Sequence, residues 1–300
     1  MEKRTFRAVF FDLDGTLLPM DVDVFMKSYF RALGGYVARM GIAPDRFMAG
    51  MKRGITAMAT NDSGHANAES FWPEFLACID MPEGVTADTL QAAIGDFYEN
   101  EFGELGADVK PNPAAARAIE ALVAKGYPLV LATMPMFPRR AVEWRLRWAG
   151  IDPAVFSRIT TFENSTAVKP KPDYYAENLA AAGVEGRDVL MVGNNTKEDL
   201  AACQLGCEGF LVTDFLIDPV GFEVFSVRHG SMEKFADWVD SLPECADPAQ
   251  GVSDAIVPAA ARERVIAACG IADGQAGGAK TLEEAGRSGG TDFVINGMED

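Results

Sequence analysis

The chain has 300 residues, of which 48% are hydrophobic, and its formal net charge at pH 7 is −17. This length suits roughly two domains, and the apolar share is enough to build a substantial core. The acidic balance argues against a broad nucleic-acid-binding surface, which needs Lys and Arg to neutralise phosphates. It leaves room for a small anionic substrate, because a local positive pocket can form on an acidic protein.

The cysteines and histidines argue against disulfide, zinc and histidine-based sites. The five cysteines form no CxxC pair, which favours neither a disulfide framework nor a zinc site. A histidine-based site would need His65 or His229, the only two present, and we expect neither to be catalytic. No apolar run reaches the roughly 18–20 residues of a membrane span, and the basic start "MEKRTFRAVF" lacks the apolar stretch of a signal peptide. We therefore expect a soluble, cytoplasmic protein with no membrane partner.

The first predicted element is a buried strand over residues 8–11, an apolar run bounded by Asp and Gly. A helical region follows up to about residue 106. Apolar residues recur there at helical spacing, and no strand pattern is present. The predicted helices cover residues 22–40, 44–58, 69–79 and 87–102.

The pattern then alternates between strands and helices. Strands are predicted at residues 128–133, 158–161, 189–192 and 209–212, and helices at 114–125, 138–149, 173–182 and 196–205. This alternation is typical of a mostly parallel sheet covered by helices on both faces. We expect a Rossmann-like doubly wound α/β core (residues 1–18 and 108–244), an inserted helical cap (19–107), and an Ala/Gly-rich tail (245–300). The tail is expected to be partly flexible, with a helix within 254–269 and linker-like "GQAGGAK" and "GRSGG" segments.

Polar residues follow several of the predicted strands. Asp12 and Asp14 end the first strand, Thr133 ends the second, and Asn194 and Asp199 follow the strand at 189–192. A further loop, "VKPKP", precedes the helix at 173–182. In an open α/β sheet, ligands bind outside the carboxyl ends of the strands. The sequence thus predicts one site at one edge of the sheet.

These residues resemble the haloacid dehalogenase superfamily of phosphohydrolases. The family's four motifs have counterparts here in "DLDGT", "LVLAT", "KPKPDYY" and "VGNNTKED", in the family's order. The resemblance covers residues 6 to about 242, and the helical insert matches the family's cap. It implies a Mg²⁺-dependent phosphatase acting on a small phosphorylated metabolite.

The resemblance implies that Asp12 is the nucleophile and forms an aspartyl-phosphate, which divides one difficult hydrolysis into two easier steps. Asp14 would be the general acid/base, because residues two apart in an extended segment face the same side. By resemblance, Asp12 and Asp14 would also bind the metal. The structural alternatives are a turn-capping carboxylate for Asp12 and an ordinary turn aspartate for Asp14. The acid at position 14 argues against dehalogenation, since relatives with that chemistry usually lack it.

Four further residues complete the expected phosphate site. Gly15 would let the chain bend and bring backbone amides near the phosphate. Thr133, with amides near Met134, would bind a phosphate oxygen, although Thr is also common in strands. Lys169 would stabilise the phosphate and keep Asp12 ionised. Lys171 is its local rival, and we expect it to be a surface charge.

The acidic motif departs from the family at Asn194, where relatives most often have an Asp that binds Mg²⁺. A neutral Asn oxygen remains a possible ligand with weaker electrostatic attraction. We expect Asn195 and Glu198 to form an N-cap and capping box. Asp199, the motif's later carboxylate, is a further candidate metal ligand, and it would contact Lys169 or a metal-bound water.

Two other classes of function stay open on the same scaffold. The Asn194–Asn195 pair motivates a catalytically weak or inactive binding or regulatory protein. A phosphotransferase or mutase is the third reading, because the cap selects the acceptor. "FPRRAVEWRLRWAG" is expected to be an amphipathic surface helix with Trp toward the sheet, and Arg139 or Arg140 is a minor candidate for substrate contact. Substrate identity and oligomeric state are left open.

Overall fold

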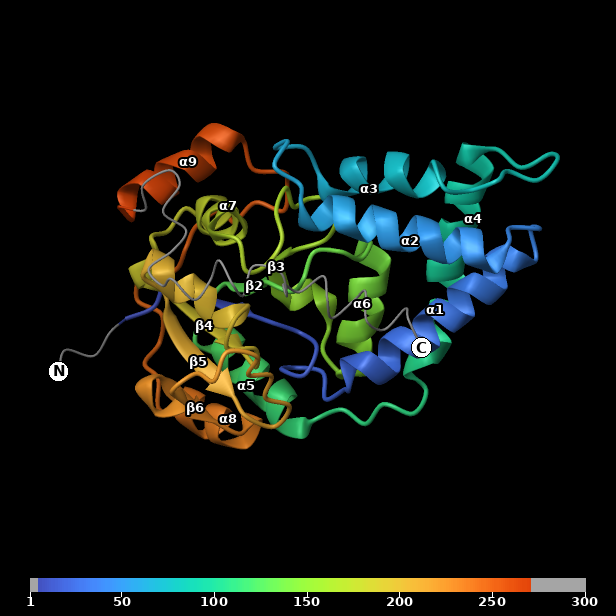
Figure 1. Cartoon of the computed structure of the whole chain (residues 1–300). Helices are drawn as coiled ribbons and strands as arrows, with labels where there is room; N and C mark the ends of the chain where they lie inside the picture. The colour runs from blue at the N-terminus through green and yellow to red at the C-terminus, as the bar shows by residue number, and fades with distance from the viewer. Residues whose placement is uncertain (1–4, 271–300) are drawn as a thin grey trace.

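The computed structural model describes residues 5–270. Its centre is a six-stranded parallel sheet with the strand order β3-β2-β1-β4-β5-β6, seen on the left of Figure 1. The strands are β1 (Ala8–Phe11), β2 (Leu129–Leu131), β3 (Phe156–Ile159), β4 (Val189–Gly193), β5 (Glu208–Val212) and β6 (Arg228–Gly230). The predicted doubly wound α/β fold is confirmed.

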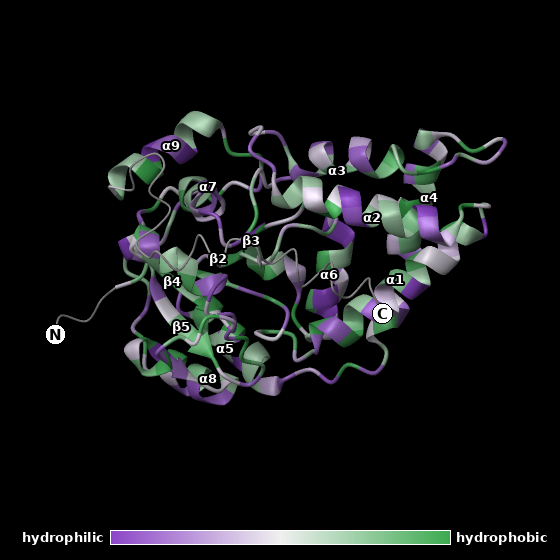
Figure 2. Ribbon diagram, in the orientation of Figure 1, coloured by the Kyte–Doolittle hydropathy of each residue, from purple (hydrophilic) through white to green (hydrophobic). Residues whose placement is uncertain are grey.

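Side chains of β1 alternate between the two faces of the sheet, as its extended backbone requires. Val9 and Phe11 pack on one face with α5 (Pro113–Ala124), α6 (Arg139–Trp148) and α8 (Met232–Asp240). Ala8 and Phe10 pack on the other face with α7 (Pro172–Ala182) and the 3₁₀ helix η4 (Asp199–Leu205). Figure 2 shows hydrophobic strands at the centre and helices of mixed hydropathy around them. All four residues of β1 are buried, which explains its continuous apolar sequence.

A helical cap is inserted between β1 and β2, as predicted, and lies beside the sheet in Figure 1. It consists of α1 (Val22–Ala38), α2 (Pro44–Ala59), α3 (Asn67–Leu76), α4 (Ala87–Asn100) and the 3₁₀ helix η1 (Phe102–Gly106). Side-chain caps begin two of these helices: Asp21 accepts from the amide of Val24, and Thr86 from that of Thr89. Pro44 begins α2 at a position where a missing N–H costs nothing.

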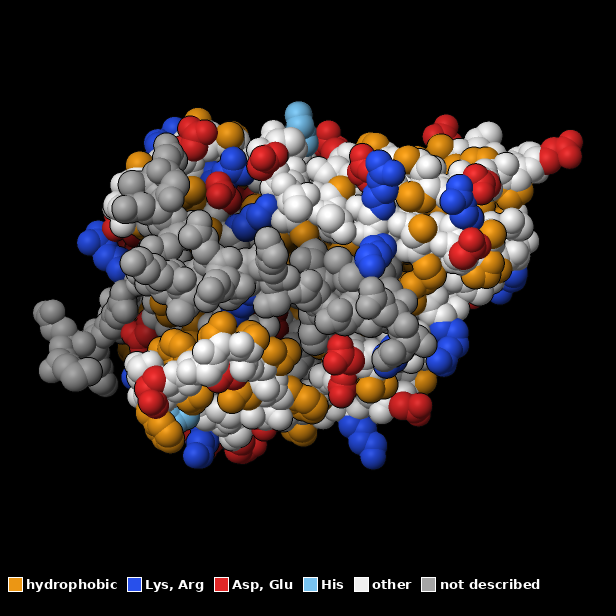
Figure 3. Space-filling model, in the orientation of Figure 1, with side chains coloured by type: hydrophobic (Ala, Val, Ile, Leu, Met, Phe, Trp, Pro, Cys, Tyr) orange, Lys and Arg blue, Asp and Glu red, His pale blue; other side chains and the backbone are white. Residues whose placement is uncertain are grey.

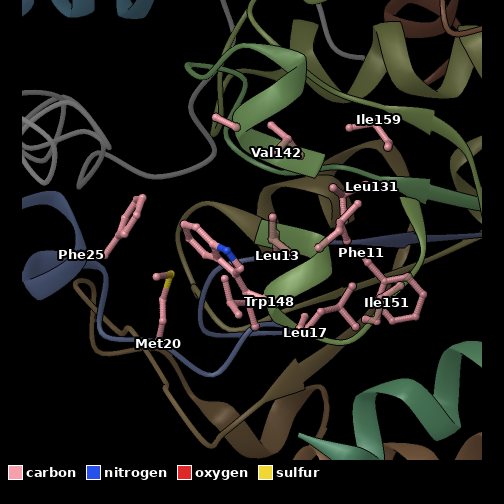
Figure 4. Close-up of a cluster of buried hydrophobic side chains, with 14 of the residues drawn as sticks. Phe11, Leu13, Leu17, Met20, Phe25, Leu131, Val142, Trp148, Ile151 and Ile159 are labelled. Atoms are coloured by element: carbon pink, nitrogen blue, oxygen red, sulfur yellow. The ribbon is translucent and has the colours of Figure 1, made fainter. Parts of the chain in front are cut away.

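The cap is fastened to the core through α6. The indole of Trp144 donates to the Tyr98 carbonyl at 3.0 Å, and that of Trp148 to the Gly103 carbonyl at 3.1 Å. We expected these indoles on the sheet side; Trp148 does belong to the buried cluster that contains Phe11 of β1, and both indoles also hydrogen-bond to the cap. Figure 4 shows Trp148 in a buried cluster with Phe25 of α1 and residues of the loop after β1. A second anchor is the fully buried Asn67, whose amide donates to the carbonyls of Pro135 and Ala167.

Three parts of the core differ from the predicted pattern. β6 and α8 were not predicted, because the "RHG" strand is short and lacks an apolar run. The helix expected over 196–205 begins only at Asp199 and is a 3₁₀ helix. The Asn195 side chain accepts from the amide of Glu198 in the turn before it. Short 3₁₀ turns η2 (Pro153–Val155), η3 (Gly186–Asp188) and η5 (Val224–Ser226) join the other elements.

The described part of the tail packs on the core. α9 (Ala259–Ala268) lies against α7, and Asn164 donates to the carboxylate of Asp254 at 3.1 Å. The buried guanidinium of Arg158 donates to the carbonyls of Ser253 and Ala255. The "GQAGGAK" and "GRSGG" segments lie outside the described residues.

Two observations bear on partners. No helix among residues 5–270 combines the length and apolar character that a membrane span requires. On the face shown in Figure 3, basic and acidic side chains lie interspersed over the cap. Over the described cap residues in this view, the basic side chains do not gather into one large patch of the kind that binds nucleic acid.

Candidate active site

Asp12 directly follows the central strand β1, and its amide continues the ladder by donating to the Val192 carbonyl of β4 at 2.9 Å. The carboxyl ends of β1, β2 and β4 are neighbours in the sheet. This topology brings together residues that are far apart in the sequence. Asp12 is 8% exposed and lines a cavity between core and cap.

Lys169 joins Asp12 to Asp199. Its ammonium lies 2.8 Å from Asp12 Oδ1 and 2.6 Å from Asp199 Oδ1, with the lysine side chain only 1% exposed. Burial alone would lower the pKa of Lys169, but the two carboxylates outweigh burial and raise that pKa well above its usual value. Lys171, its rival in the sequence, is half-buried and donates to the Asn61 carbonyl at the cap boundary instead.

Thr16 connects Asp12 to Asn194. The Thr16 hydroxyl lies 3.0 Å from both Asp12 Oδ2 and Asn194 Oδ1. The Asn194 amide nitrogen donates to the Phe215 carbonyl at 2.6 Å, which leaves the Asn194 oxygen to accept from the Thr16 hydroxyl. Gly15 makes the close approach possible: its φ is +82°, and a Cβ there would lie 2.3 Å from Asn194 Nδ2.

The loop after β4 is organised by Asn195 and Asp199. Asn195 Oδ1 accepts from the amides of Lys197 and Glu198, each at 3.0 Å, so Asn195 caps the turn as expected. The backbone amide of Asn195 donates to Asp199 Oδ2 at 2.8 Å. The capping-box prediction required it to donate to the Glu198 side chain instead. Glu198 instead lines the cavity. Burial raises the pKa of Glu198 to about 8, against the lowering effect of Lys169.

Asp14 forms a buried ion pair with Arg145 of α6, a residue that the sequence reading did not select. Burial raises the pKa of Asp14 to about 6, although the Arg145 charge acts to lower it. The guanidinium also lies 4.4 Å from the centre of the Phe137 ring. Arg139 and Arg140, the arginines we had considered, pair with Asp254 and Glu99 and do not line the cavity.

The phosphate-site candidates lie on the same cavity. Thr133 and Met134 both line the cavity. The Thr133 carbonyl accepts a hydrogen bond from the Tyr174 hydroxyl at 2.7 Å. The amide of Gly15 donates to the Leu18 carbonyl and so serves the turn itself. The amides of Leu13 and Asp14 make no hydrogen bond within residues 5–270. These two amides are therefore among the donors in this loop that remain available to an anion.

The oxygen donors near Asp12 fit a hard divalent cation. No group of three or more His, Cys, Asp or Glu side chains in the described chain is arranged to hold a metal, so any such site must use mixed donors. The Thr16 hydroxyl has one proton and can serve only one of its two acceptors at a time. Either Asp12 Oδ2 or Asn194 Oδ1 therefore receives no hydrogen bond from Thr16 and can bind a cation. The Asp14 carbonyl accepts no hydrogen bond within the described residues. Mg²⁺ commonly takes one or two carboxylates plus waters and substrate phosphate, which this set allows.

Comparison with known proteins identifies the family. The family model for haloacid dehalogenase-like hydrolases matches residues 6–205. A predicted phosphoglycolate phosphatase from Haemophilus somnus 129PT is 16% identical, with a TM-score of 0.49 and coverage of 79% of this chain and 99% of that chain. CbbY from Rhodobacter sphaeroides, solved with phosphate, is 19% identical (TM-score 0.49; 76% and 96% covered). A putative β-phosphoglucomutase from Thermotoga maritima is 20% identical (TM-score 0.47; 79% and 100% covered).

No curated protein matches the chain. The family match nevertheless spans two thirds of the sequence and contains all four predicted motifs. This chain belongs to the haloacid dehalogenase-like hydrolases.

Proposed function

We propose that the protein is a phosphatase that hydrolyses a small phosphate monoester through an aspartyl-phosphate on Asp12. The observation that carries the proposal is the buried Lys169 ammonium, held between Asp12 and Asp199, two carboxylates that line the cavity. A buried cation beside the nucleophile keeps Asp12 ionised and offsets the negative charge of an entering phosphate.

Asp12 attacks phosphorus, and the bond from phosphorus to the leaving oxygen breaks. Asp14 donates a proton to that oxygen, for which its pKa of about 6 is suitable near neutral pH. Asp14 then takes a proton from water as the water attacks phosphorus. The Asp12–phosphorus linkage breaks, and inorganic phosphate is released with both aspartates restored. Thr133 and the amides of Leu13 and Asp14 bind the phosphate oxygens.

We propose Mg²⁺ as the cofactor, held by the Asp12 carboxylate, the Asp14 carbonyl and the Asn194 side-chain oxygen. Bound there, Mg²⁺ neutralises charge on the transferring phosphoryl group. Asp199 accepts a hydrogen bond from the Lys169 ammonium at Oδ1 and one from the Asn195 backbone amide at Oδ2. We therefore propose that Asp199 positions those groups, in place of the direct metal contact expected from the sequence.

The test is a panel of phosphate esters assayed with Mg²⁺, with EDTA, and with the Asp12→Asn protein. We expect turnover that needs the metal and is lost in Asp12→Asn. Asp45→Asn is a matched control, because Asp45 is an exposed aspartate of α2 outside the cavity. Turnover that persists in Asp12→Asn would overturn the assignment of the nucleophile.

The same assay separates the other two functions that the scaffold allows. A binding or regulatory protein would cleave no ester yet bind a ligand tightly. A phosphotransferase or mutase would pass the phosphoryl group to an added alcohol faster than to water. No contact in the cavity favours either reading over hydrolysis.

A further inference from the structure

The cavity extends from the catalytic aspartates into the interior of the cap, and its two ends differ in chemistry. Each described cap residue on its wall is hydrophobic or aromatic, among them Phe25, Met26, Leu33, Met51, Ile55 and Met58. The charged residues on the wall all come from the core. A bound ester would therefore place its phosphate at the polar end and its leaving group against apolar side chains.

The cap offers few hydrogen-bonding groups to a leaving group. On its side of the cavity, within the described chain, the polar side-chain atoms are the Trp72 indole nitrogen and the hydroxyls of Tyr29 and Tyr98. The two hydroxyls lie 2.6 Å apart and bond to each other. A sugar leaving group would have to give up the water around several hydroxyls and find few partners here. Each hydroxyl left unpaired would weaken binding by about tenfold.

A second anionic group on the substrate would also lack a partner. Arg145 is the one basic side chain among the described residues of the wall, and it is committed to Asp14. Its Nε and Nη2 atoms make no hydrogen bond, but both are sealed from solvent and from the cavity surface. The guanidinium is stacked on Phe137. It thus offers the leaving group no exposed donor pair for a carboxylate or a second phosphate.

We infer that the substrate is the phosphate monoester of an apolar alcohol or phenol, whose hydrocarbon part enters the cap. This inference rests on the proposed phosphatase function and specifies its substrate class. The cavity has a volume of about 120 Å³, which includes the polar end next to Asp12. An apolar cavity of roughly 150 Å³ accepts benzene, so the leaving group is expected to be no larger than one ring or a short branched chain.

The experiment compares hydrolysis of ethyl, butyl, 3-methylbutyl and phenyl phosphate with that of glucose 6-phosphate and phosphoglycolate, with acetyl phosphate as a reference for the chemistry alone. We expect kcat/KM to rise about threefold to fourfold for each added CH₂ until the cavity is full. The sugar phosphate and the carboxylated ester should be cleaved far more slowly than phenyl phosphate.

Two isoleucine variants test whether the cap interior sets this preference. Ile55 lines the cavity, whereas Ile79 is buried in the cap away from it. Ile55→Ala should shift the preference toward longer or larger alkyl groups, read as the ratio of kcat/KM for 3-methylbutyl and butyl phosphate. Ile79→Ala removes the same atoms elsewhere and should leave that ratio unchanged, even if it lowers the melting temperature.

The outcomes are distinguishable. Cleavage of acetyl phosphate together with a preference for glucose 6-phosphate or phosphoglycolate would overturn the apolar substrate class and leave the phosphatase intact. An equal shift of the alkyl ratio in both isoleucine variants would show that the cavity is not the leaving-group site. Failure to cleave any of the phosphate esters or acetyl phosphate would overturn the proposed function and this inference with it.

Discussion

Arg145 of α6 donates a hydrogen bond to the carboxylate of Asp14, and the two side chains are only 2% and 15% exposed. The pair joins the helix after β2 to the loop after β1. It places a positive charge beside the proposed acid/base and opposes the rise in the pKa of Asp14 that burial causes. Arg145 therefore acts on the reaction through Asp14.

Replacing Arg145 by Gln should move the pH profile upward. The first step needs protonated Asp14, so kcat/KM for phenyl phosphate should fall as pH rises through the Asp14 pKa, about 6 in the native protein. Removing the positive charge raises that pKa, and the falling limb of the profile should shift to higher pH. Arg147→Gln is the control, because Arg147 lies on the same helix with 42% of its side chain exposed. If the falling limb of the Arg145→Gln profile lies at the same pH as in the native protein, the role given to Arg145 is wrong.

Arg145→Gln also breaks a buried ion pair, a change that typically costs about 3–5 kcal/mol when one partner stays behind. Protonation of Asp14 should reduce this cost at low pH. Urea unfolding at pH 5 and pH 8 should therefore show a larger loss of stability at pH 8. Arg145→Lys keeps the charge and should keep the pH profile closer to that of the native protein.

Lys169 and Lys171 are separated by one proline, and their replacement should have different effects. Lys169→Met should lower kcat by about 10²–10³-fold, the usual cost of removing one preorganised electrostatic group. It also leaves Asp12 and Asp199 without their shared cation, so stability should fall more at pH 8 than at pH 5. Lys171→Met removes a hydrogen bond to the Asn61 carbonyl and should retain most of the activity. Comparable losses in both variants would contradict the assignment.

Asn194→Asp should make both activity and stability more dependent on Mg²⁺. An added carboxylate attracts the cation, so the Mg²⁺ concentration for half activity should fall. The variant also loses the amide donor to the Phe215 carbonyl, now 2.6 Å away. A buried carbonyl facing a carboxylate is unfavourable by about 1–3 kcal/mol, and the melting temperature without Mg²⁺ should drop.

Thermal unfolding of Asn194→Asp with and without Mg²⁺ measures this second effect independently of turnover. The increase in melting temperature on adding Mg²⁺ should exceed that of the native protein, because the ion binds the folded state alone. Ca²⁺-free buffer with EDTA provides the baseline. An unchanged Mg²⁺ requirement and an unchanged thermal shift would exclude Asn194 as a ligand.

The sequence was sufficient to predict how Asp12, Lys169 and Asp199 come together. Each follows or precedes a strand or helix with a clear periodicity, and parallel topology brings the ends of such strands to one edge. Arg145 was missed because the many arginines of its helix suggested a solvated face. Its spacing from Ala141 and Trp148 places it on the buried stripe of α6, and a charge on such a stripe indicates a buried partner.

The cavity itself could not be predicted. The helical periodicity of residues 44–58 indicates that apolar residues such as Met51 and Met58 face inward. The structure buries both and also shows them on the cavity wall. Whether an inward-facing side chain touches a neighbour or an open space depends on how four helices pack together, and hydrophobic patterning does not encode that distance. The same limit applies to Glu198, whose spacing from Asn195 suited a capping box equally well.

Glu177 of α7 gives a test of stability that is independent of catalysis. It is fully buried, and its Oε2 accepts from the amide and hydroxyl of Thr166, at 3.0 and 2.8 Å. Its other oxygen has no partner among the described residues. Burial raises the pKa of Glu177 to about 7, against the lowering effect of the Thr166 bonds and of Arg158 and Arg262.

A carboxyl group whose pKa is raised in the folded state holds its proton there after the unfolded chain has lost it. From about pH 4.5 to about pH 7, the folded protein therefore binds more protons, and the group's contribution to stability falls as pH rises. Glu177→Gln has no proton to lose. Relative to the native protein, the variant should gain stability across that window by up to about 3 kcal/mol, and the difference should level off above pH 7.

Urea unfolding of both proteins between pH 4.5 and pH 8.5 measures this difference. Other titrating groups, Asp14 and Glu198 included, are common to both proteins and cancel in the comparison. Glu120→Gln, at an exposed position of α5, should give a difference that does not depend on pH. A Glu177→Gln protein that becomes less stable than the native one as pH rises would mean that Glu177 is ionised in the folded state and held by Arg158 and Arg262. Glu177 would then add to the charge contacts that hold α9 on α7, where Arg262 already pairs with Asp173 at 2.9 Å.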